Sequence, residues 1–177
     1  MFKYLTKADK SEVASLFSSV FTASEGEKEG ALIGDLALKL SLAIDNQEII
    51  SLGAYDQEAI IGVIFFTRLS FEEKISVYML APVAVSTLHQ RQGVGKELIH
   101  YGLNELKNRL VEVVVTYGDP LYYSATGFKP LSVNIVQAPH ALSMPQGWQG
   151  QSLSQTLIPA IQGRPTCVKE FDDLAYW

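Results

Sequence analysis

The chain has 177 residues, of which 47% are hydrophobic, and its mean hydropathy is +0.12, so it suits one well-buried domain and would be cramped as two. The formal net charge of −5 and the lack of a Lys/Arg cluster argue against a nucleic-acid partner and weakly favour a cationic substrate such as an amine. The single Cys167 excludes an internal disulfide, no apolar run is long enough to cross a bilayer, and the N-terminal residues do not form a signal segment. We therefore expect a cytoplasmic protein without membrane association.

The first part of the chain is predicted to be a short strand followed by two helices. Residues 2–5 have the composition of a strand, and Thr6 is a candidate N-cap for the helix that follows. Apolar residues recur at helical spacing in two runs: Val13, Leu16, Phe17, Val20 and Phe21, and then Leu32, Ile33, Leu36, Ala37 and Leu40. Residues 22–30 between these runs contain glycines and glutamates, which predicts a mobile polar connection.

Residues 46–86 change to the composition of strands. β-branched and aromatic residues dominate residues 49–55, 59–67 and 75–85, so we predict three sequential antiparallel strands. Pro82 lies within the third of them, where it cannot donate a ladder hydrogen bond. We therefore expect a bulge or a splay at Pro82, where this strand leaves its neighbour.

A glycine-containing turn follows this strand and opens a helix. Gly93 and Gly95 lie at the start of the helix, where several backbone N–H groups have no partner within the helix. These groups point at one spot at the positive end of the helix dipole, and such a spot attracts phosphate. The turn is not a P-loop, since no Gly-Lys-Ser/Thr follows, and it is not a dinucleotide-binding fingerprint, since position 98 is Leu98. The apolar stripe of the helix consists of Ile99, Leu103, Leu106 and Leu110. We expect Gly102 to let the helix approach the sheet closely, and residues 111–116 to form a parallel strand that completes a βαβ unit.

The pattern Gln/Arg-x-x-Gly-x-Gly/Ala, filled here by Gln90, Gly93 and Gly95, resembles the pyrophosphate loop of the GNAT acetyltransferase superfamily. The resemblance implies that the diphosphate of coenzyme A contacts the turn, whose residues are Gln90, Arg91, Gln92, Gly93, Val94, Gly95 and Lys96. It also implies that pantetheine pairs with the freed edge of the splayed strand, at Val83, Ala84 and Val85, where an N–H polarises the thioester carbonyl. The alternative is a glycine-rich turn without a ligand.

A second pattern lies in residues 117–128. Asp119 followed by Pro120 is a good helix start, with a capping residue and proline at the first helical position. The pattern Tyr-x-x-x-Gly-Phe, met by Tyr123, Gly127 and Phe128, resembles the second GNAT motif. The Gly-Asp-Pro-x-Tyr-Tyr that leads into it resembles the YhbS-like branch of the superfamily.

The second motif implies a role for a phenol. In the family this tyrosine faces the thioester sulfur, so Tyr123 is our candidate catalytic residue, with Tyr122 as the fallback. A phenol with a pKa of about 10 stays protonated at neutral pH, so it can hydrogen-bond to, or protonate, the sulfur as the C–S bond breaks.

No general base is identified. The predicted third strand has no carboxylate after Glu73, and Asp119 is expected to cap a helix. His89 has two open interpretations, a phosphate contact or a surface position, and His100 and His140 have no partner spacing. Proton transfer to water, or an amine that arrives neutral, stays open. Metal-ligand spacing and a Ser-His-Asp pattern are both missing from the sequence, so we expect no metal.

The C-terminal part is less regular. Residues 130–136 and 152–161 are predicted strands, and residues 137–150 between them are a loop-rich insertion. We expect Trp148 to cover apolar surface rather than line an acceptor groove, and Cys167 to be buried and inert.

Together these patterns predict one domain over residues 1–177, in which residues 1–136 match the GNAT pattern and residues 137–177 form a loosely matching extension. The implied fold class is α/β (α+β by some schemes), the GNAT acyl-CoA N-acyltransferase fold: a mixed sheet of about seven strands with a splayed fourth strand and helices on both faces. The implied function is transfer of acetyl from acetyl-CoA to a primary amine of a small molecule, peptide or protein, by direct attack in a ternary complex. The alternative is an acyl-CoA binding or sensing module without turnover. Homodimer formation is left open.

Overall fold

The computed structural model describes residues 1–155 and 157–177, which divide into two compact units. The first unit contains Met1–Phe66 and Pro82–Gly102, and the second contains Thr67–Ala81 and Leu103–Trp177. Strands β3 (Ala59–Leu69) and β4 (Val77–Val85) and helix α3 (Val94–Asn108) each begin in one unit and end in the other. These three elements carry the chain between the units.

Seven strands form one sheet in the order β1-β2-β3-β4-β5-β7-β6. The strands outside β3 and β4 are β1 (Phe2–Tyr4), β2 (Ile49–Asp56), β5 (Val113–Tyr117), β6 (Lys129–Pro130) and β7 (Trp148–Ser152). β1 is antiparallel to β2, β7 is antiparallel to β5 and to β6, and β4 is parallel to β5. The predicted mixed sheet of about seven strands is confirmed, as is the parallel strand that follows the crossover helix.

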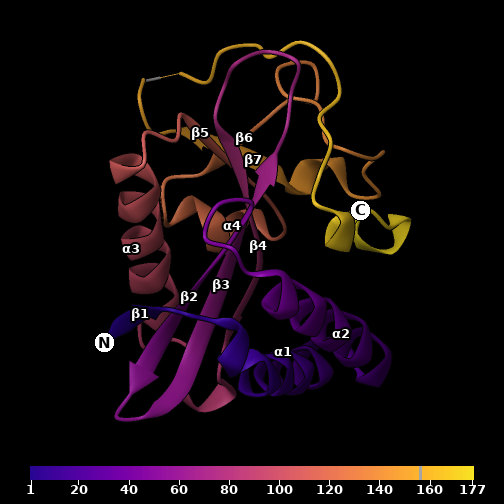
Figure 1. The fold of residues 1–177 in the computed structure, drawn as a ribbon. Helices are drawn as coiled ribbons and strands as arrows, with labels where there is room; N and C mark the ends of the chain where they lie inside the picture. The colour runs from indigo at the N-terminus through magenta and orange to yellow at the C-terminus, as the bar shows by residue number, and fades with distance from the viewer. Residues whose placement is uncertain (156) are drawn as a thin grey trace. The chain divides into compact units, whose positions relative to one another are not determined.

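In the first unit, helices α1 (Lys10–Glu25) and α2 (Glu27–Ala43) lie side by side (Figure 1). Thr6 is confirmed as a cap: its hydroxyl accepts a hydrogen bond from Ala8 N–H, and the Asp9 carboxylate accepts one from Thr6 N–H. The capped element is a short 3₁₀ turn, Lys7–Asp9, that leads into α1. The predicted apolar stripes are also confirmed, with Val13, Phe17 and Val20 of α1 and Leu36, Ala37 and Leu40 of α2 buried.

The predicted mobile connection over residues 22–30 is wrong. Gly26, with φ of +97°, separates α1 from α2, and the remaining residues of this stretch are helical. The glutamates at 27 and 29 lie in the first turn of α2, where a carboxylate is stabilised by the positive end of the helix dipole. Gly30 is a packing residue, since a Cβ there would overlap the hydroxyl of Thr22. The glycines and glutamates that suggested a loop therefore lie at the end of α1 and the start of α2, which pack closely against each other.

Strand β3 has a helix on each of its faces. Phe65 contacts Phe17 of α1, with ring centroids 5.9 Å apart, whereas a Cβ at Gly102 of α3 would lie 2.5 Å from Cε2 of Phe66. Consecutive residues of a strand point to opposite faces, so α1 covers one face and α3 the other. Helices on both faces and the close approach at Gly102 are therefore confirmed. Phe65 and Phe66 are fully buried, and each such side chain stabilises a fold by about 1.5–3 kcal/mol.

In the second unit, β5 lies between β4 and β7. Val113, Val114 and Val115 are fully buried, as a parallel strand covered on both faces requires. The predicted strand over residues 130–136 is wrong beyond its first residue, because β6 contains Lys129–Pro130 and ends there.

The predicted last strand over residues 152–161 is also wrong. Among the described residues of this range, Ser152 alone belongs to a strand, and Thr156 lies outside the described residues. The strand that completes the sheet is β7, which begins inside the predicted loop 137–150 and extends to Ser152. Its sequence, WQGQS, contains no β-branched residue, so local propensity does not predict it. Antiparallel pairing with β5 determines it instead.

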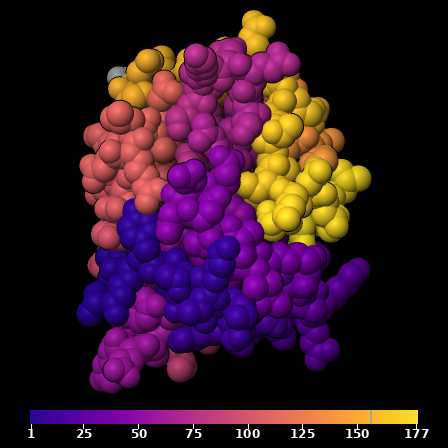
Figure 2. All heavy atoms as spheres, in the orientation of Figure 1, coloured from indigo at the N-terminus to yellow at the C-terminus, as the bar shows by residue number. Residues whose placement is uncertain are grey.

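The tail after β7 returns to the body of the second unit. Thr166 and Ser70, which directly follows β3, exchange two backbone hydrogen bonds of 2.9 Å. Two 3₁₀ turns follow, Lys169–Phe171 and Leu174–Tyr176, and Trp177 is buried with its indole N–H donating to Phe171 O. In Figure 2 the yellow tail forms part of the surface that faces the viewer. Within the described residues, none of the helices has the length and apolar character that a membrane span needs.

Candidate active site

The turn before α3 has the backbone that the sequence predicts. Arg91 and Gly93 both have positive φ, of 60° and 87°, and α3 begins at Val94. Glu97 N–H donates to Gly93 O over 2.9 Å, as the first intrahelical bond of α3. The N–H groups of residues 94–96 precede it, and a helix offers such groups no partner of its own. A Cβ at Gly93 would be in ordinary van der Waals contact with Glu97 Oε1, 3.7 Å away.

Two glutamines of the turn hold its shape. Gln90 Nε2 donates to Val85 O, and Gln92 Nε2 donates to Leu88 O, each over 3.0 Å. These bonds tie the turn to the end of β4 and to the preceding 3₁₀ turn, so both side chains have a structural task. The remaining predicted contact residues differ in exposure: Arg91, Gly93 and Lys96 are exposed, Val94 is half-buried and Gly95 is buried.

The end of β4 carries the predicted pantetheine residues. β4 pairs with β5 from Val77↔Val113 to Leu80↔Thr116, and then continues through the buried Pro82 to Val85. Val83 is half-buried, and Ala84 and Val85 are buried.

Tyr123 lies in α4 (Pro120–Ser124), a short helix that begins as predicted. Asp119 Oδ1 accepts a hydrogen bond from Leu121 N–H over 2.9 Å, and Pro120 occupies the first turn, so the predicted cap is confirmed. A Cβ at Gly118 would lie 2.9 Å from Cε2 of Tyr123, so the glycine leaves room for this ring. The ring also contacts Phe128 edge-on, with centroids 5.8 Å apart.

The Thr116 side chain lies beside the hydroxyl of Tyr123, and Thr116 Oγ1 donates to Leu80 O over 2.8 Å. Burial raises the pKa of Tyr123 above its usual value, and the interaction with the Thr116 side chain opposes this only in part. Tyr123 is therefore protonated throughout the physiological range.

The other candidates have different surroundings. Tyr122 is 42% exposed, its ring stands perpendicular to that of Tyr123, and burial raises its pKa. His89 is half-buried with Nε2 3.8 Å from Asp56 Oδ2, and its Nδ1 is buried with no hydrogen-bond partner among the described residues. His100 is exposed on α3. Trp148 is fully buried and donates to Val136 O, so its side chain packs in the core, as expected.

Sequence reasoning missed two groupings. Thr116 was treated only as a strand residue, and the available signal was a single hydroxyl at the end of the Val113–Val115 run. His140, Cys167 and Asp172 also come together, each with one potential ligand atom within 4.8 Å of the others. His140 and Cys167 are 27 positions apart in the sequence, and this separation matches no common spacing of metal ligands, so the sequence pattern alone does not reveal the cluster.

A family model described as the acetyltransferase (GNAT) domain matches residues 1–131. YjhQ of Escherichia coli K12, described as an uncharacterized N-acetyltransferase, is 29% identical over 133 residues, which span 73% of this chain and 69% of YjhQ. YhbS of the same strain, described likewise, is 33% identical over 75 residues, which span 42% of this chain and 45% of YhbS, less than half of that relative.

Two crystal structures have a similar fold. The GNAT family N-acetyltransferase YhbS from Escherichia coli in complex with CoA has a TM-score of 0.79 at 22% identity, over 98% of this chain and 92% of YhbS. A GNAT family acetyltransferase from Brucella melitensis in complex with acetyl-CoA has a TM-score of 0.70 at 23% identity, over 97% of each chain.

Proposed function

The chain belongs to the GNAT acetyltransferase family, and we propose that it is an active transferase. In this proposal it transfers an acetyl group from acetyl-CoA to a primary amine by direct attack in a ternary complex. The observation that carries the proposal is the turn before α3, where the N–H groups of residues 94–96 precede the first intrahelical bond. Such amides bind phosphate oxygens, and the structures of similar fold contain CoA or acetyl-CoA.

The turn supports binding of the diphosphate in two ways. The absence of a side chain at Gly93 lets phosphate oxygens approach the amides. The exposed Arg91 and Lys96 add positive charge beside them. In this proposal the backbone of Val83, Ala84 and Val85 pairs with the pantetheine arm, and one of its N–H groups polarises the thioester carbonyl.

Tyr123 stabilises the leaving group in this proposal. The amine lone pair forms the C–N bond, and the electron pair of the C–S bond leaves with the sulfur. A simple thiol has a pKa of about 8.5 and an ordinary phenol one of about 10, so full proton transfer to the thiolate would be uphill by at least about 2 kcal/mol. Burial raises the pKa of Tyr123 further and makes the transfer less favourable still. Tyr123 therefore donates a hydrogen bond to the thiolate and keeps its proton.

The acceptor must reach the thioester as a free amine. β4 has no carboxylate among its residues, VYMLAPVAV, so the proposal assigns no general base. The ammonium proton formed on attack goes to water, and only the neutral fraction of the amine reacts. The formal net charge of −5 supports a cationic acceptor, either a small molecule or a peptide, whose local concentration an acidic surface raises.

A binding or sensing module for acyl-CoA is the second candidate, and the lack of a carboxylate on β4 favours it. Two measurements separate the candidates: calorimetric titration with CoA, and thiol release from acetyl-CoA with a panel of amines and peptides. Binding together with release that depends on one class of amine supports the transferase. Tight binding with no release across the panel supports the sensor, and no heat of binding from folded protein rejects both.

A further inference from the structure

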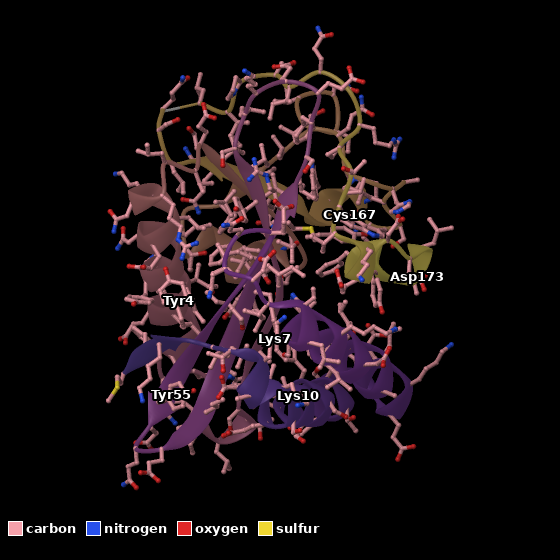
Figure 3. The ribbon with its side chains drawn as sticks, viewed as in Figure 1. Tyr4, Lys7, Lys10, Tyr55, Cys167 and Asp173 are labelled. Atoms are coloured by element: carbon pink, nitrogen blue, oxygen red, sulfur yellow. The ribbon has the colours of Figure 1, made fainter. Side chains whose placement is uncertain are left out.

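Three side chains of metal-ligand type meet in the second unit, outside the family motifs. His140 comes from the segment before β7, and Cys167 and Asp172 come from the tail. One potential ligand atom from each lies within 4.8 Å of the others, and His140 Nε2 is 2.7 Å from Asp172 Oδ1. Figure 3 places the Cys167 sulfur beside the 3₁₀ turns of the tail. Cys167 is the only cysteine of the chain.

Neighbouring contacts hold the backbone on both sides of this cluster. Thr166, directly before Cys167, is fixed by its two hydrogen bonds to Ser70. Arg164 Nη1 donates to the carbonyl oxygens of Ala138 and Pro139, directly before His140. The buried Trp177 packs against the His140 ring, with centroids 5.9 Å apart. None of these contacts uses a ligand atom, so an ion would find the three side chains already near one another.

We propose that His140, Cys167 and Asp172 bind one zinc ion, with water as the fourth ligand. Imidazole, thiolate and carboxylate are all ligands of zinc, whereas magnesium and calcium prefer oxygen alone. In a tetrahedral site with bonds of about 2.0–2.3 Å, ligand atoms lie about 3.3–3.7 Å apart. The His140–Asp172 pair opens by about half an ångström to reach this separation, a shift within side-chain rotation.

The surroundings allow an ion to enter. The Asp172 side chain is 63% exposed and that of His140 is 26% exposed, so one side of the cluster is open to solvent and to the water ligand. Without an ion, burial and the charge of Asp172 raise the pKa of Cys167 to about 11. A nucleophilic thiol requires the opposite shift, so the cluster does not suit a Cys-His-Asp nucleophile.

Zinc at this position would join the tail to the segment before β7. None of the three residues belongs to the proposed catalytic or CoA-binding set. It also departs from the sequence-based expectation of no metal, since the ligands meet only in the fold. The predicted effect is on the stability of the second unit, and binding of the ion is measurable without any enzyme assay.

The test uses tag-free, chelator-treated full-length protein and titration with zinc chloride against a competing indicator. We expect one ion per chain, a concentration-dependent rise in Tm, and, with Co²⁺ in place of zinc, sulfur-to-cobalt charge-transfer absorption that only Cys167 can produce. Cys167→Ala and Asp172→Asn should each weaken zinc binding by more than about 100-fold, since even residues that only hydrogen-bond to a metal ligand contribute about 10- to 100-fold. His100→Ala, which removes an exposed histidine elsewhere, is the matched control and should bind as the wild type does.

Each result decides the proposal. Failure of the wild-type chain to bind zinc overturns it, as does binding of equal affinity in Cys167→Ala or Asp172→Asn. Loss of zinc binding in His100→Ala would move the site elsewhere and also overturn it. Asp172 is largely exposed, so Asp172→Asn should fold even where Cys167→Ala does not, and circular dichroism verifies the fold of each variant.

Discussion

Replacing Tyr123 by phenylalanine removes the one hydroxyl that we assign to the leaving thiolate. The ring remains between Tyr122 and Phe128, with centroids 5.0 and 5.8 Å away, so packing changes little. Thr116 keeps its 2.8 Å bond to Leu80 O and loses its interaction with the Tyr123 hydroxyl, which costs about 1 kcal/mol of stability. Folding and CoA binding should therefore be close to those of the wild type.

The effect on turnover should be far larger. A preorganised donor aimed at charge that develops in the transition state contributes about 100- to 1,000-fold to kcat. We expect Tyr123→Phe to lose kcat by about this factor, with a small change in CoA affinity, because the hydroxyl acts on the sulfur only as the bond breaks. The assay is thiol release with a verified amine acceptor, and calorimetry gives the CoA affinity of the same preparation.

Two further variants make the test specific. Tyr122→Phe removes the neighbouring, partly exposed hydroxyl and should keep kcat within about twofold of the wild type, since no role is assigned to it. Thr116→Val preserves shape but removes the hydroxyl that interacts with Tyr123, and should lower kcat by about 10- to 100-fold. Unchanged kcat in Tyr123→Phe, or a larger loss in Tyr122→Phe than in Tyr123→Phe, would contradict the role assigned to the Tyr123 hydroxyl.

Three other predictions follow from backbone and burial. Gly93→Ala should raise the calorimetric Kd for CoA by about tenfold or more, because it adds a side chain at φ of +87° beside the proposed phosphate site. Gly163, which has a similar φ of +84° and open space around it, is the control, and an equal loss of CoA affinity in Gly163→Ala would contradict the proposed phosphate site. Gly102→Ala should lower the free energy of unfolding in urea by about 1–3 kcal/mol, because its Cβ would lie 2.5 Å from Phe66, and a neutral effect would show that the ring moves aside. Because the pKa of Tyr123 is raised in the folded state, ionisation of this phenol at high pH favours the unfolded chain. The contribution of Tyr123 to the free energy of unfolding is therefore constant below about pH 10 and falls as the pH rises further. Urea titrations from pH 9 to about pH 11 should show a shallower alkaline decline in Tyr123→Phe than in the wild type, and parallel declines would count against the burial of this hydroxyl.

The local sequence was sufficient to predict those features of the fold that depend on residues close together in the chain. Helical spacing located α1, α2 and α3, and β-branched composition located β2, β3 and β4, because each of these elements buries a face that its own sequence encodes. The caps at Thr6 and Asp119 were predictable for the same reason, since each side chain bonds to an N–H two residues ahead.

Features that depend on a distant partner were not predictable. β7 contains polar residues and glycine, and it is a strand because β5 supplies its antiparallel partner. Gly30 suggested flexibility, whereas its missing side chain permits contact with Thr22 on the preceding helix. The His140 cluster depends on the tail returning to Ser70, a contact across nearly a hundred positions. In each case the decisive energy comes from packing or pairing that local composition does not contain.

The candidate site combines both kinds of information. The motif predicted Tyr123, but the partner of its hydroxyl follows from register: parallel pairing sets Thr116 opposite Leu80, and Thr116 then donates to the Leu80 carbonyl. The Thr116 side chain in turn interacts with the Tyr123 hydroxyl, whose single proton serves the thiolate in the proposed mechanism. A shift of β5 by one residue would turn Thr116 to the opposite face of the sheet and away from the phenol. The register of β4 and β5 is therefore as much a part of the proposed catalytic arrangement as the tyrosine itself.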